Sequence, residues 1–424
     1  MEPGRDAVWS GQFNARLTAQ GIQPLSYVRA YICDDTMFDR SGTFQYALNN
    51  KFGVMDAAGQ QYISVATGPA LLHDFTNPDT VAWWDTKLRN MLDLGFNGFM
   101  QDFGEQVLSD MHFKDGSTGA AMHNRYTVLY HQVTRKFIDG YMAQHPGRHI
   151  FFYTRAGYSG RPGAAGYENS NFPGDEATNW GIAGGLGSLT SDLTNRGVGG
   201  APGFNTDVGG YANFTTPPTD KELFLRWAEW AALTPFYRVH MDGAAPLMPW
   251  DFGQGAVDVY RRLPQFHNDA VPLLQGLWTE QQSDGIPIDR PLWLQYPKDP
   301  ASVRQDQEYT LGNDILVAPV VTAGATTRAV YFPPDCWQDP RDAHVYQGPM
   351  TATVAAPLDQ LPYFYRCGTS PLGPAYAVAR PGAQVGSLPL TSAARPLISL
   401  ATPAALLGCL LLAGLLFLGR RRPY

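Results

Sequence analysis

The sequence has few charged residues and no excess of positive charge. Only 16% of its 424 residues are charged, against roughly 25% in an ordinary soluble domain. Lys and Arg number 31 and Asp and Glu number 38, which gives a formal net charge of −7. A nucleic-acid-binding protein needs a basic face, so we expect no nucleic-acid partner.

Cysteines and familiar catalytic signatures are also scarce. The cysteines form no CxxC pair, so we expect neither a disulfide framework nor a structural zinc site. No HExxH motif, GxSxG motif or Ser-His-Asp order is present. We therefore expect no metal and no cofactor. The four cysteines are Cys33, Cys336, Cys367 and Cys409.

Apolar and aromatic residues are plentiful. They make up 44% and 12% of the chain, which is enough to bury a large core and excludes global disorder. A chain of 424 residues has room for two or three domains.

The C-terminal stretch predicts a membrane anchor at residues 396–424. Leu397–Gly419 is a run of 23 residues without a charge, long enough to cross a hydrocarbon core about 30 Å thick. A buried core helix is the alternative. Arg420, Arg421 and Arg422 follow and predict a cytoplasmic end, so the rest of the chain would be extracellular.

The preceding residues, 371–395, are rich in Pro, Gly and Ala and predict a flexible linker. Within them, Leu388–Ser392 (LPLTS) resembles a degenerate bacterial cell-wall sorting signal, although a plain single-pass anchor fits equally well. The N-terminal residues, Met1–Asp6, lack a signal peptide. Because an anchored extracellular protein needs one, we expect that the natural start lies upstream.

Two patterns divide the rest of the chain. In residues 24–285 short apolar strands alternate with amphipathic helices, which indicates parallel strands with crossover helices and a (β/α)8 TIM-type barrel over residues 1–285. Short strands between Pro and Gly turns predict a small β-sandwich over residues 286–370. Strands are expected at Pro24–Ile32, Gly95–Phe103 and His149–Ala156, and further strands are expected to lead into Asn205–Asp207 and Tyr237–His240. Helices are expected at Asp79–Leu94 and Ala120–His145, and near Ile182–Asn195, Lys221–Ala232 and Gly255–Leu274.

Polar residues follow several of the expected barrel strands, where the chemistry of such barrels takes place. They are mostly carboxylates, together with one Arg, one His and many aromatic residues. This set suits glycosidic bond cleavage, in which one carboxylate attacks the sugar and another protonates the leaving oxygen. Each residue also has a structural interpretation. Glu105 could be a charge at a helix N-terminus, and Trp180 and Trp227 could belong to the core.

At these residues the sequence resembles glycoside hydrolase family 31, and within it the sulfoquinovosidase and α-glucosidase branch. The resemblance covers about residues 20–368, with its motifs in one order. They are Gln101–Glu105 (QDFGE), Met122–Asn124, Thr154–Gly157, Pro173–Glu176 followed by Trp180, Thr206–Tyr211 (TDVGGY), Thr234–His240, Arg290–Trp293 and Leu311–Pro319.

The resemblance implies a retaining mechanism on α-glycosides. Asp102 would be the nucleophile and Asp175 the acid/base, with carboxyl groups about 5–5.5 Å apart. A carbohydrate or glycolipid would be the substrate. The residues expected to bind the substrate are Arg155, His240, Asp207, Tyr211, Glu105, Trp180 and Arg29.

The sequence departs from the family pattern at three places. Arg29 stands where the family has an acidic or amide residue before Pro, and it could receive an anionic group or pair with Asp34 or Asp35. Glu176 stands where the branch often has Gln or Asn. The first barrel strands and an N-terminal β-sandwich are absent, so the alternative function is an inactive carbohydrate-binding surface module.

Overall fold

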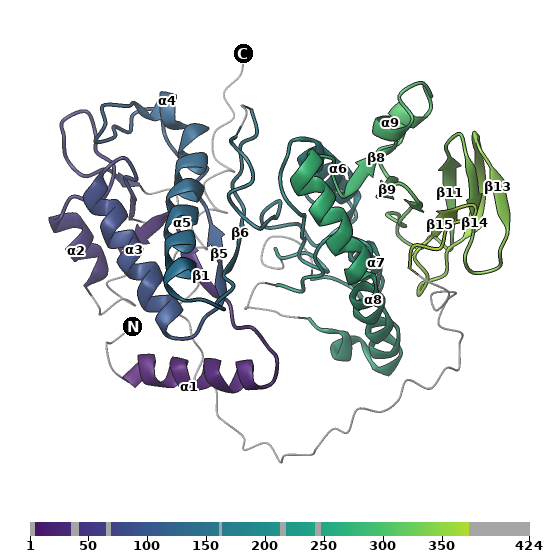
Figure 1. Ribbon diagram of the computed structural model, residues 1–424, viewed down its shortest axis with the longest axis horizontal. Helices are drawn as coiled ribbons and strands as arrows, with labels where there is room; N and C mark the ends of the chain where they lie inside the picture. Colours follow the sequence, from purple (N-terminus) through teal and green to yellow (C-terminus); the bar gives the residue numbers. More distant parts are fainter. Residues whose placement is uncertain are drawn as a thin grey trace. The chain divides into compact units, whose positions relative to one another are not determined.

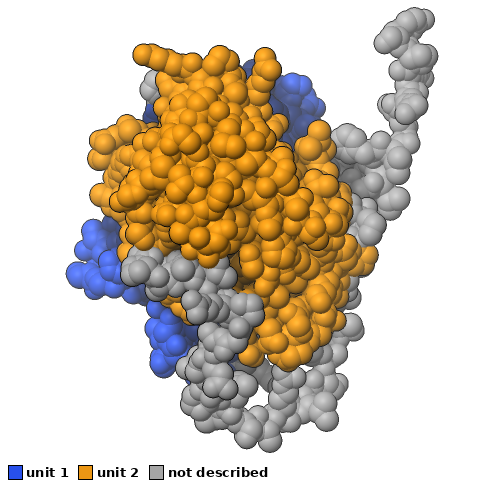
Figure 2. Space-filling model, turned by 90° about the vertical axis from the view of Figure 1, so that its right-hand side faces the viewer, with its two compact units in different colours: residues 1–169, 386–424 blue, residues 170–385 orange. Residues whose placement is uncertain are grey.

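The computed structural model describes residues 5–34, 42–64, 69–160, 163–212, 218–241 and 247–372, with side chains from residue 10. These residues form two compact units, one ending at Asn169 and the other beginning at Ser170. Figure 2 colours the first unit blue and the second orange.

The first unit is built on three parallel strands, with β5 (Gly98–Asp102) between β1 (Ser26–Arg29) and β6 (Phe151–Thr154). Arg29 lies opposite Asp102 in the β1–β5 register, and Thr154 lies opposite Gln101 in the next pair. The carboxyl ends of the three strands therefore meet at one edge, which brings their polar ends together. The other elements are α1 (Arg5–Ala19), β2 (Tyr31–Cys33), α2 (Thr43–Asn49), β3 (Ile63–Ser64), β4 (Ala70–Leu72), α3 (Pro78–Asp93), α4 (Gly119–Met122) and α5 (Arg125–Gln144).

Helices α3 and α5 connect these strands and pack against each other (Figure 1). The side chain of Asn77 accepts a hydrogen bond from the Asp79 backbone N–H, and Pro78 occupies the first turn, so α3 begins at a well-formed cap. Trp84 of α3 donates to the hydroxyl of Thr134 of α5 at 3.2 Å, and both residues are buried. The apolar spacing of the sequence thus produces the expected crossover helices.

In the second unit, helix α7 (Lys221–Ala231) is buried from Leu223 to Ala231. Its Arg226 and Glu229 form a buried ion pair at 2.8 Å. Arg226 also donates to three backbone carbonyl oxygens of the later β-rich region, at Ala325, Ala356 and Pro357. The guanidinium can be buried here because its Nη1 and Nη2 groups find a carboxylate and three carbonyl oxygens as partners. The other elements up to residue 284 are β7 (Ser170–Asn171), α6 (Leu189–Val198), α8 (Gln254–Asp284) and the 3-10 turns Leu186–Ser188 and Pro249–Phe252.

Strands dominate the second unit after residue 288 (Figure 1). Six of them form one sheet in the order β13-β12-β15-β10-β9-β8, and β11 and β14 form a separate antiparallel pair. Trp337, Phe332 and Phe364 lie in the core between them. The bounds are β8 (Asp289–Pro291), α9 (Leu292–Gln295), β9 (Tyr309–Leu311), β10 (Ile315–Val317), β11 (Thr327–Phe332), β12 (Cys336–Gln338), β13 (Val345–Gln347), β14 (Met350–Ala355) and β15 (Tyr363–Arg366), with a 3-10 turn at Ser302–Arg304.

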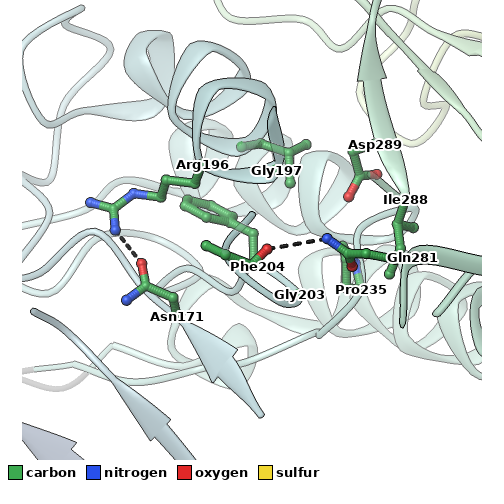
Figure 3. Close-up of a pocket in the computed structure, with 11 residues that line it drawn as sticks. Asn171, Arg196, Gly197, Gly203, Phe204, Pro235, Gln281, Ile288 and Asp289 are labelled. Atoms are coloured by element: carbon green, nitrogen blue, oxygen red, sulfur yellow. Dashed lines mark hydrogen bonds between the residues drawn. The ribbon is translucent and has the colours of Figure 1, made fainter. Parts of the chain in front are cut away.

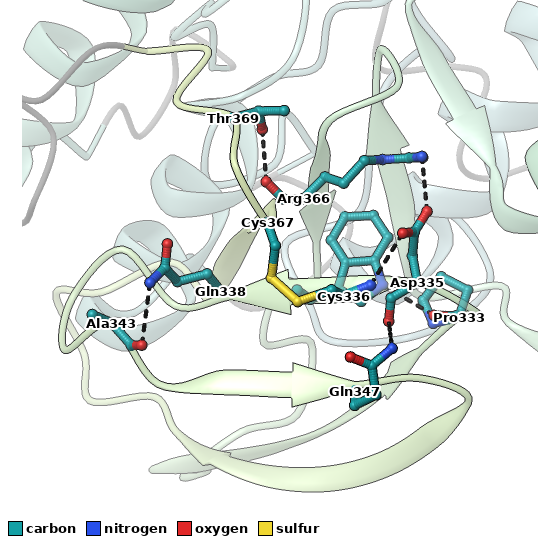
Figure 4. The surroundings of a disulfide bond; sticks show 10 residues. Pro333, Asp335, Cys336, Gln338, Ala343, Gln347, Arg366, Cys367 and Thr369 are labelled. Carbon is teal, nitrogen blue, oxygen red and sulfur yellow. Dashed lines mark hydrogen bonds and ion pairs between the residues drawn. A yellow bond between two sulfur atoms is a disulfide. The ribbon is translucent and has the colours of Figure 1, made fainter.

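A disulfide joins Cys336 and Cys367 in this region (Figure 4), a pairing that the expectation of no disulfide framework did not anticipate. Strands β12 and β15 are antiparallel neighbours and bring the two Cα atoms to 5.3 Å across 31 residues of sequence. Only the strand order makes this pairing possible. Disulfides persist in oxidising compartments, which is the kind of compartment that the predicted anchor topology implies.

Four predictions of secondary structure need correction. No strand leads into residues 205–207 or 237–240, although Phe204 forms an isolated parallel bridge with Asn171. A hydrogen bond from Val208 N to Arg238 O joins the two segments. The helix expected at residues 182–195 begins only at Leu189, after a Gly-rich turn. The strand expected at residues 24–32 breaks at Ala30 into β1 and β2. Each of these segments combines apolar residues with tight turns. In such segments the pattern of apolar residues along the sequence cannot distinguish a strand from an extended loop.

No helix within the described ranges is long and apolar enough to cross a membrane. The predicted span, Leu397–Gly419, and the linker before it from residue 373 lie outside those ranges. The anchor therefore stays a prediction from the sequence.

Replacing both Cys336 and Cys367 by Ser should lower the free energy of unfolding of the second unit by about 2–4 kcal/mol, because the unfolded chain regains the entropy of a closed loop. Urea unfolding followed by Trp fluorescence measures this change. The parent protein in reductant should match the variant. Equal stability of oxidised and reduced parent protein would contradict the assignment.

Candidate functional site

Asp102 is the centre of a polar cluster at the end of β5. It is 6% exposed. Its Oδ1 accepts a hydrogen bond from the Phe103 backbone N–H at 2.9 Å and lies 3.4 Å from Arg155 Nη1. Its Oδ2 accepts from the Tyr27 hydroxyl at 2.6 Å. Both oxygens are thus held by donors from three successive parallel strands or their ends.

Phe103 makes this arrangement possible. Its φ of 61° lies in the left-handed region, and Gly104 follows at 109°. This turn directs the Phe103 N–H back at the preceding carboxylate and brings its ring under Arg155, whose Cζ lies 4.1 Å from the ring centroid. A residue without β-branching tolerates such a backbone only where neighbours fix it.

Arg155 connects the expected nucleophile to Glu105. Its Nη2 contacts Glu105 Oε1 at 2.5 Å, and its side chain is 13% exposed. Residues 103–108 form a loop without helix. The interpretation of Glu105 as a helix N-terminal charge is therefore wrong, and its main contact is the ion pair with Arg155.

Tyr27 was not among the residues predicted from the sequence. Its side chain is 46% exposed, but its hydroxyl is held against Asp102. Burial, and next the negative charge of Asp102, raise the pKa of Tyr27 well above its usual value, so the hydroxyl stays protonated and donates. Tyr27 lies in β1, two residues before the strand ends. A search limited to polar residues at strand ends therefore does not find it.

Arg29 ends β1 directly opposite Asp102 and is half-buried. The positive charge of Arg29 lowers the pKa of Tyr27, but burial raises that pKa by more. Arg29 therefore lies at the same strand edge as the Asp102 cluster. Asp35, one of its two suggested partners, lies outside the described residues.

A second polar cluster forms in the second unit around Glu176, Asp207 and Arg238. Arg238 Nη2 pairs with Asp207 Oδ1 at 2.5 Å, and the guanidinium lies 4.6 Å from the ring centroid of Phe172. The hydroxyl of Thr206 donates to Glu176 Oε1 at 2.6 Å. Asp207 and Glu176 are 1% and 3% exposed.

The surroundings of Glu176 favour its protonated form. Burial, and next the negative charge of Asp207, raise the pKa of Glu176 well above its usual value. Arg238 acts in the opposite direction and lowers the pKa of Glu176. A protonated Glu, like Gln, can both donate and accept hydrogen bonds, although it has one donor hydrogen where Gln has two.

The backbone of Glu176 also organises the loops around the expected acid/base. Its carbonyl oxygen accepts hydrogen bonds from the N–H groups of Tyr211 and Ala212, both at 2.9 Å. Tyr211 stacks on His240 with centroids 5.1 Å apart and planes at 15°. Asp175, next to Glu176, is exposed. The structure thus brings Asp207, Tyr211 and His240 together near the loop that carries Asp175.

The glycines of residues 206–211 are required by close packing. Gly209 and Gly210 have φ values of 93° and 84°. A Cβ at Gly210 would approach Thr178 Cα at 2.9 Å, so any other residue would push the Asp175 loop away.

The two tryptophans considered in the sequence analysis, Trp180 and Trp227, differ in how far they are buried. Trp227 is fully buried and donates to the Thr206 hydroxyl at 3.0 Å, so it belongs to the core. Trp180 is partly buried against the same core. Trp227 is thus a core residue, and the substrate-binding role of Trp180 stays a prediction.

A cavity lies elsewhere in the second unit, among Arg196, Phe204, Gln281 and Asp289 (Figure 3). Its free volume is about 10 Å³, which holds one water molecule and no sugar. Asp289 Oδ1 is buried there without a partner among the described residues, and burial raises the pKa of Asp289 well above its usual value. This cavity is therefore not a substrate site.

Asp102 belongs to the first unit and Asp175 to the second. Their expected separation stays a prediction. Sequence reasoning missed Tyr27, Phe103 and Arg238, all of which hold a carboxylate in place. No group of three or more His, Cys, Asp or Glu side chains that could hold a metal ion occurs in the described part of the chain.

Replacing Glu176 by Gln should make stability less dependent on pH. The folded-state pKa of Glu176 is raised above its usual 4.5, so the folded protein holds a proton that the unfolded chain releases. Stability from this group is therefore lost as pH rises above that value. Urea unfolding at several pH values should show a flatter decline in the variant. The exposed-site control Asp306→Asn should follow the parent, and an equally steep decline in Glu176→Gln would refute a neutral Glu176.

Comparison with known proteins shows the family of the chain. Residues 9–276 match the glycosyl hydrolases family 31 TIM-barrel domain, and residues 285–369 match the family 31 C-terminal domain. Curated relatives include the sulfoquinovosidases of Escherichia coli, 28% identical over 86% of this chain and 54% of that protein, and of Agrobacterium fabrum, 30% identical over 84% and 53%.

Solved structures show the same similarity. A family 31 sulfoquinovosidase from E. rectale, in complex with an aza-sugar inhibitor, has a TM-score of 0.77 and 27% identity over 85% of this chain and 53% of that one. A Flavobacterium johnsoniae dextranase has a TM-score of 0.73 and 26% identity over 85% and 45%. The chain spans about half the length of the curated relatives that it matches. From the two domain matches, the chain belongs to glycosyl hydrolase family 31, with its TIM-barrel domain followed by the C-terminal β domain.

Proposed function

We propose that the protein is a retaining α-glycosidase that acts on an α-glucoside or a sulfoquinovoside-like substrate. The observation that carries the proposal is the Asp102 carboxylate at the end of β5. Both of its oxygens are held by Tyr27, Arg155 and the Phe103 N–H, and it is oriented before any substrate arrives. The family membership and the names of the curated relatives support the same class of reaction.

In the proposed first step, an oxygen of Asp102 attacks the anomeric carbon as the bond to the leaving oxygen breaks. Asp175 gives its proton to that oxygen. In the second step, Asp175 takes a proton from water, the water oxygen bonds to the anomeric carbon, and Asp102 leaves as a carboxylate.

The surroundings of Asp102 fit a nucleophile better than a general acid. Arg155 supplies a positive charge, and Phe103 and Tyr27 supply hydrogen-bond donors to the ionised form. These donors also stabilise the carboxylate when it leaves the sugar, which favours breakdown of the intermediate.

The choice between a neutral and a sulfonated sugar depends on Arg29 in this proposal. Arg29 lies at the same edge as Asp102, and a guanidinium binds a sulfonate with directed hydrogen bonds. The sulfoquinovosidase names of two relatives support the sulfonated substrate, and the α-glucosidase 2 of Bacillus thermoamyloliquefaciens, 28% identical over 85% of this chain, supports the neutral one.

A carbohydrate-binding module without hydrolysis is the second candidate. Sugar binding without turnover, by this chain and by the longest reading frame that contains it, would favour this candidate.

Asp102→Ala should reduce kcat/KM for 4-nitrophenyl α-glycosides by at least about a thousandfold, because no covalent intermediate can form. Release of 4-nitrophenol from the glucoside and the sulfoquinovoside measures the loss. The matched control is Asp139→Ala, which removes a carboxylate from the exposed face of α5. Unchanged turnover in a folded Asp102→Ala protein would overturn the assignment.

Arg29→Met should lower the preference for the sulfoquinovoside over the glucoside by at least about tenfold if Arg29 binds the sulfonate, since one charge-assisted contact is lost. The ratio of the two kcat/KM values is the measurement. Arg125→Met, at an exposed position of the same unit, controls for the change in net charge. An unchanged ratio would show that Arg29 has another role.

A further inference from the structure

A groove of about 600 Å³ opens on the C-terminal part of the second unit. It lies between the short segment after α8, helix α9 and the turn that joins β9 to β10. Its volume falls within the usual range of small-molecule sites. None of its lining residues belongs to the Asp102 cluster or the Glu176 cluster. They are Ile286, Arg290, Leu294, Gln295, Asn313, Asp314 and Arg366.

The polar rim of the groove is held in place by its own contacts. Arg366 donates to the Tyr296 hydroxyl at 3.1 Å and to the Asn313 carbonyl oxygen at 3.0 Å. It also pairs with Asp335 at 2.8 Å (Figure 4). Cys367, the next residue, is fixed by the disulfide. The guanidinium therefore keeps one orientation, which lowers the entropy cost of using it in binding.

Gln295 offers an unused acceptor. Its Nε2 donates to the Gly312 carbonyl oxygen and to Asn313 Oδ1, both at 2.8 Å. Its Oε1 is buried and has no partner among the described residues. Asn313 Oδ1 also receives Arg290 at 2.5 Å, so the amide orientations are set by fixed donors. Gln295 Oε1 is thus an oriented acceptor without a protein donor.

The charges of the groove are balanced locally. Arg290 pairs with Glu280 at 2.7 Å, and Arg366 pairs with Asp335 and, at 3.5 Å, with Asp314. Two guanidinium groups therefore face three carboxylates. This arrangement disfavours an anionic ligand, whereas the Asp314 carboxylate, with a side chain 43% exposed, is an acceptor for hydroxyl groups.

Apolar surface completes the groove. Ile286 and Leu294 are each 38% exposed, although both are large aliphatic side chains. A pyranose ring has an apolar C–H face and a rim of hydroxyl groups, which matches aliphatic side chains next to fixed carboxylate and amide acceptors. We propose that this groove is a second saccharide-binding site, for a neutral pyranose unit, separate from the catalytic clusters.

Methyl NMR of the full chain tests this site without any turnover. The Ile and Leu methyl groups are labelled, and Asp102→Ala prevents hydrolysis of the probe. Titration with maltose should shift the Ile286 and Leu294 methyl signals in a saturable way. Methanesulfonate at the same concentrations should not. Signals that stay unmoved up to the solubility of maltose, or that respond to methanesulfonate alone, would overturn the proposal.

Two variants locate the binding. Asp314→Ala and Gln295→Ala should each weaken the maltose affinity of this groove by about fivefold or more, as expected for the loss of a hydrogen bond to a charged or buried acceptor. Asp306→Asn, an exposed carboxylate outside the groove, should leave the affinity unchanged. An unchanged affinity in both groove variants would refute the site even if the proposed hydrolase activity is confirmed. Because the readout needs no turnover, loss of the proposed hydrolase function would leave this result standing.

Discussion

Ionised side chains at the ends of buried strands need compensation, and this constraint governs the whole structure. A carboxylate withdrawn from water costs several kcal/mol unless charges and donors replace its hydration. Asp102 and Asp207, 6% and 1% exposed, meet this requirement in the same way. Each pairs with one Arg, and each Arg lies over an aromatic ring.

Protonation follows from the same constraint. Arg238 faces two buried carboxyl groups, Asp207 and Glu176, and the negative charge of Asp207 adds to burial in raising the pKa of Glu176. Glu176 accepts a hydrogen bond from Thr206 through its side chain, and its carbonyl oxygen accepts from the loop of Tyr211. Asp175, one residue earlier, is exposed. Adjacent acids in one motif thus lie in different surroundings.

The β-rich part of the second unit is joined to its helical part by charge as well as by apolar packing. Arg226, buried in α7, satisfies three carbonyl oxygens of the later strands. Within the β-rich part, Arg366 at the end of β15 donates to the Asn313 carbonyl oxygen in the turn between β9 and β10. The next residue, Cys367, forms the disulfide. Such contacts fix the positions of the loop ends. The hydrogen-bond acceptors of the groove around Gln295 and Asp314 therefore keep fixed orientations.

Alternation of apolar and polar residues was enough to predict the parallel strands, the crossover helices α3 and α5 and the position of Asp102 at a strand end, because these depend on spacing within a few turns of chain. The partners of that aspartate were beyond such reasoning. Tyr27 and Phe103 reach Asp102 through the β1–β5 register and a left-handed turn. The pairing of Cys336 with Cys367 depends on strand order. The sequence by itself determined the helices, strands and acids available for chemistry, since those follow from local pattern. Only the tertiary structure decided which donors surround each acid and which acid keeps its proton, because burial and pairing arise between segments that are distant along the chain.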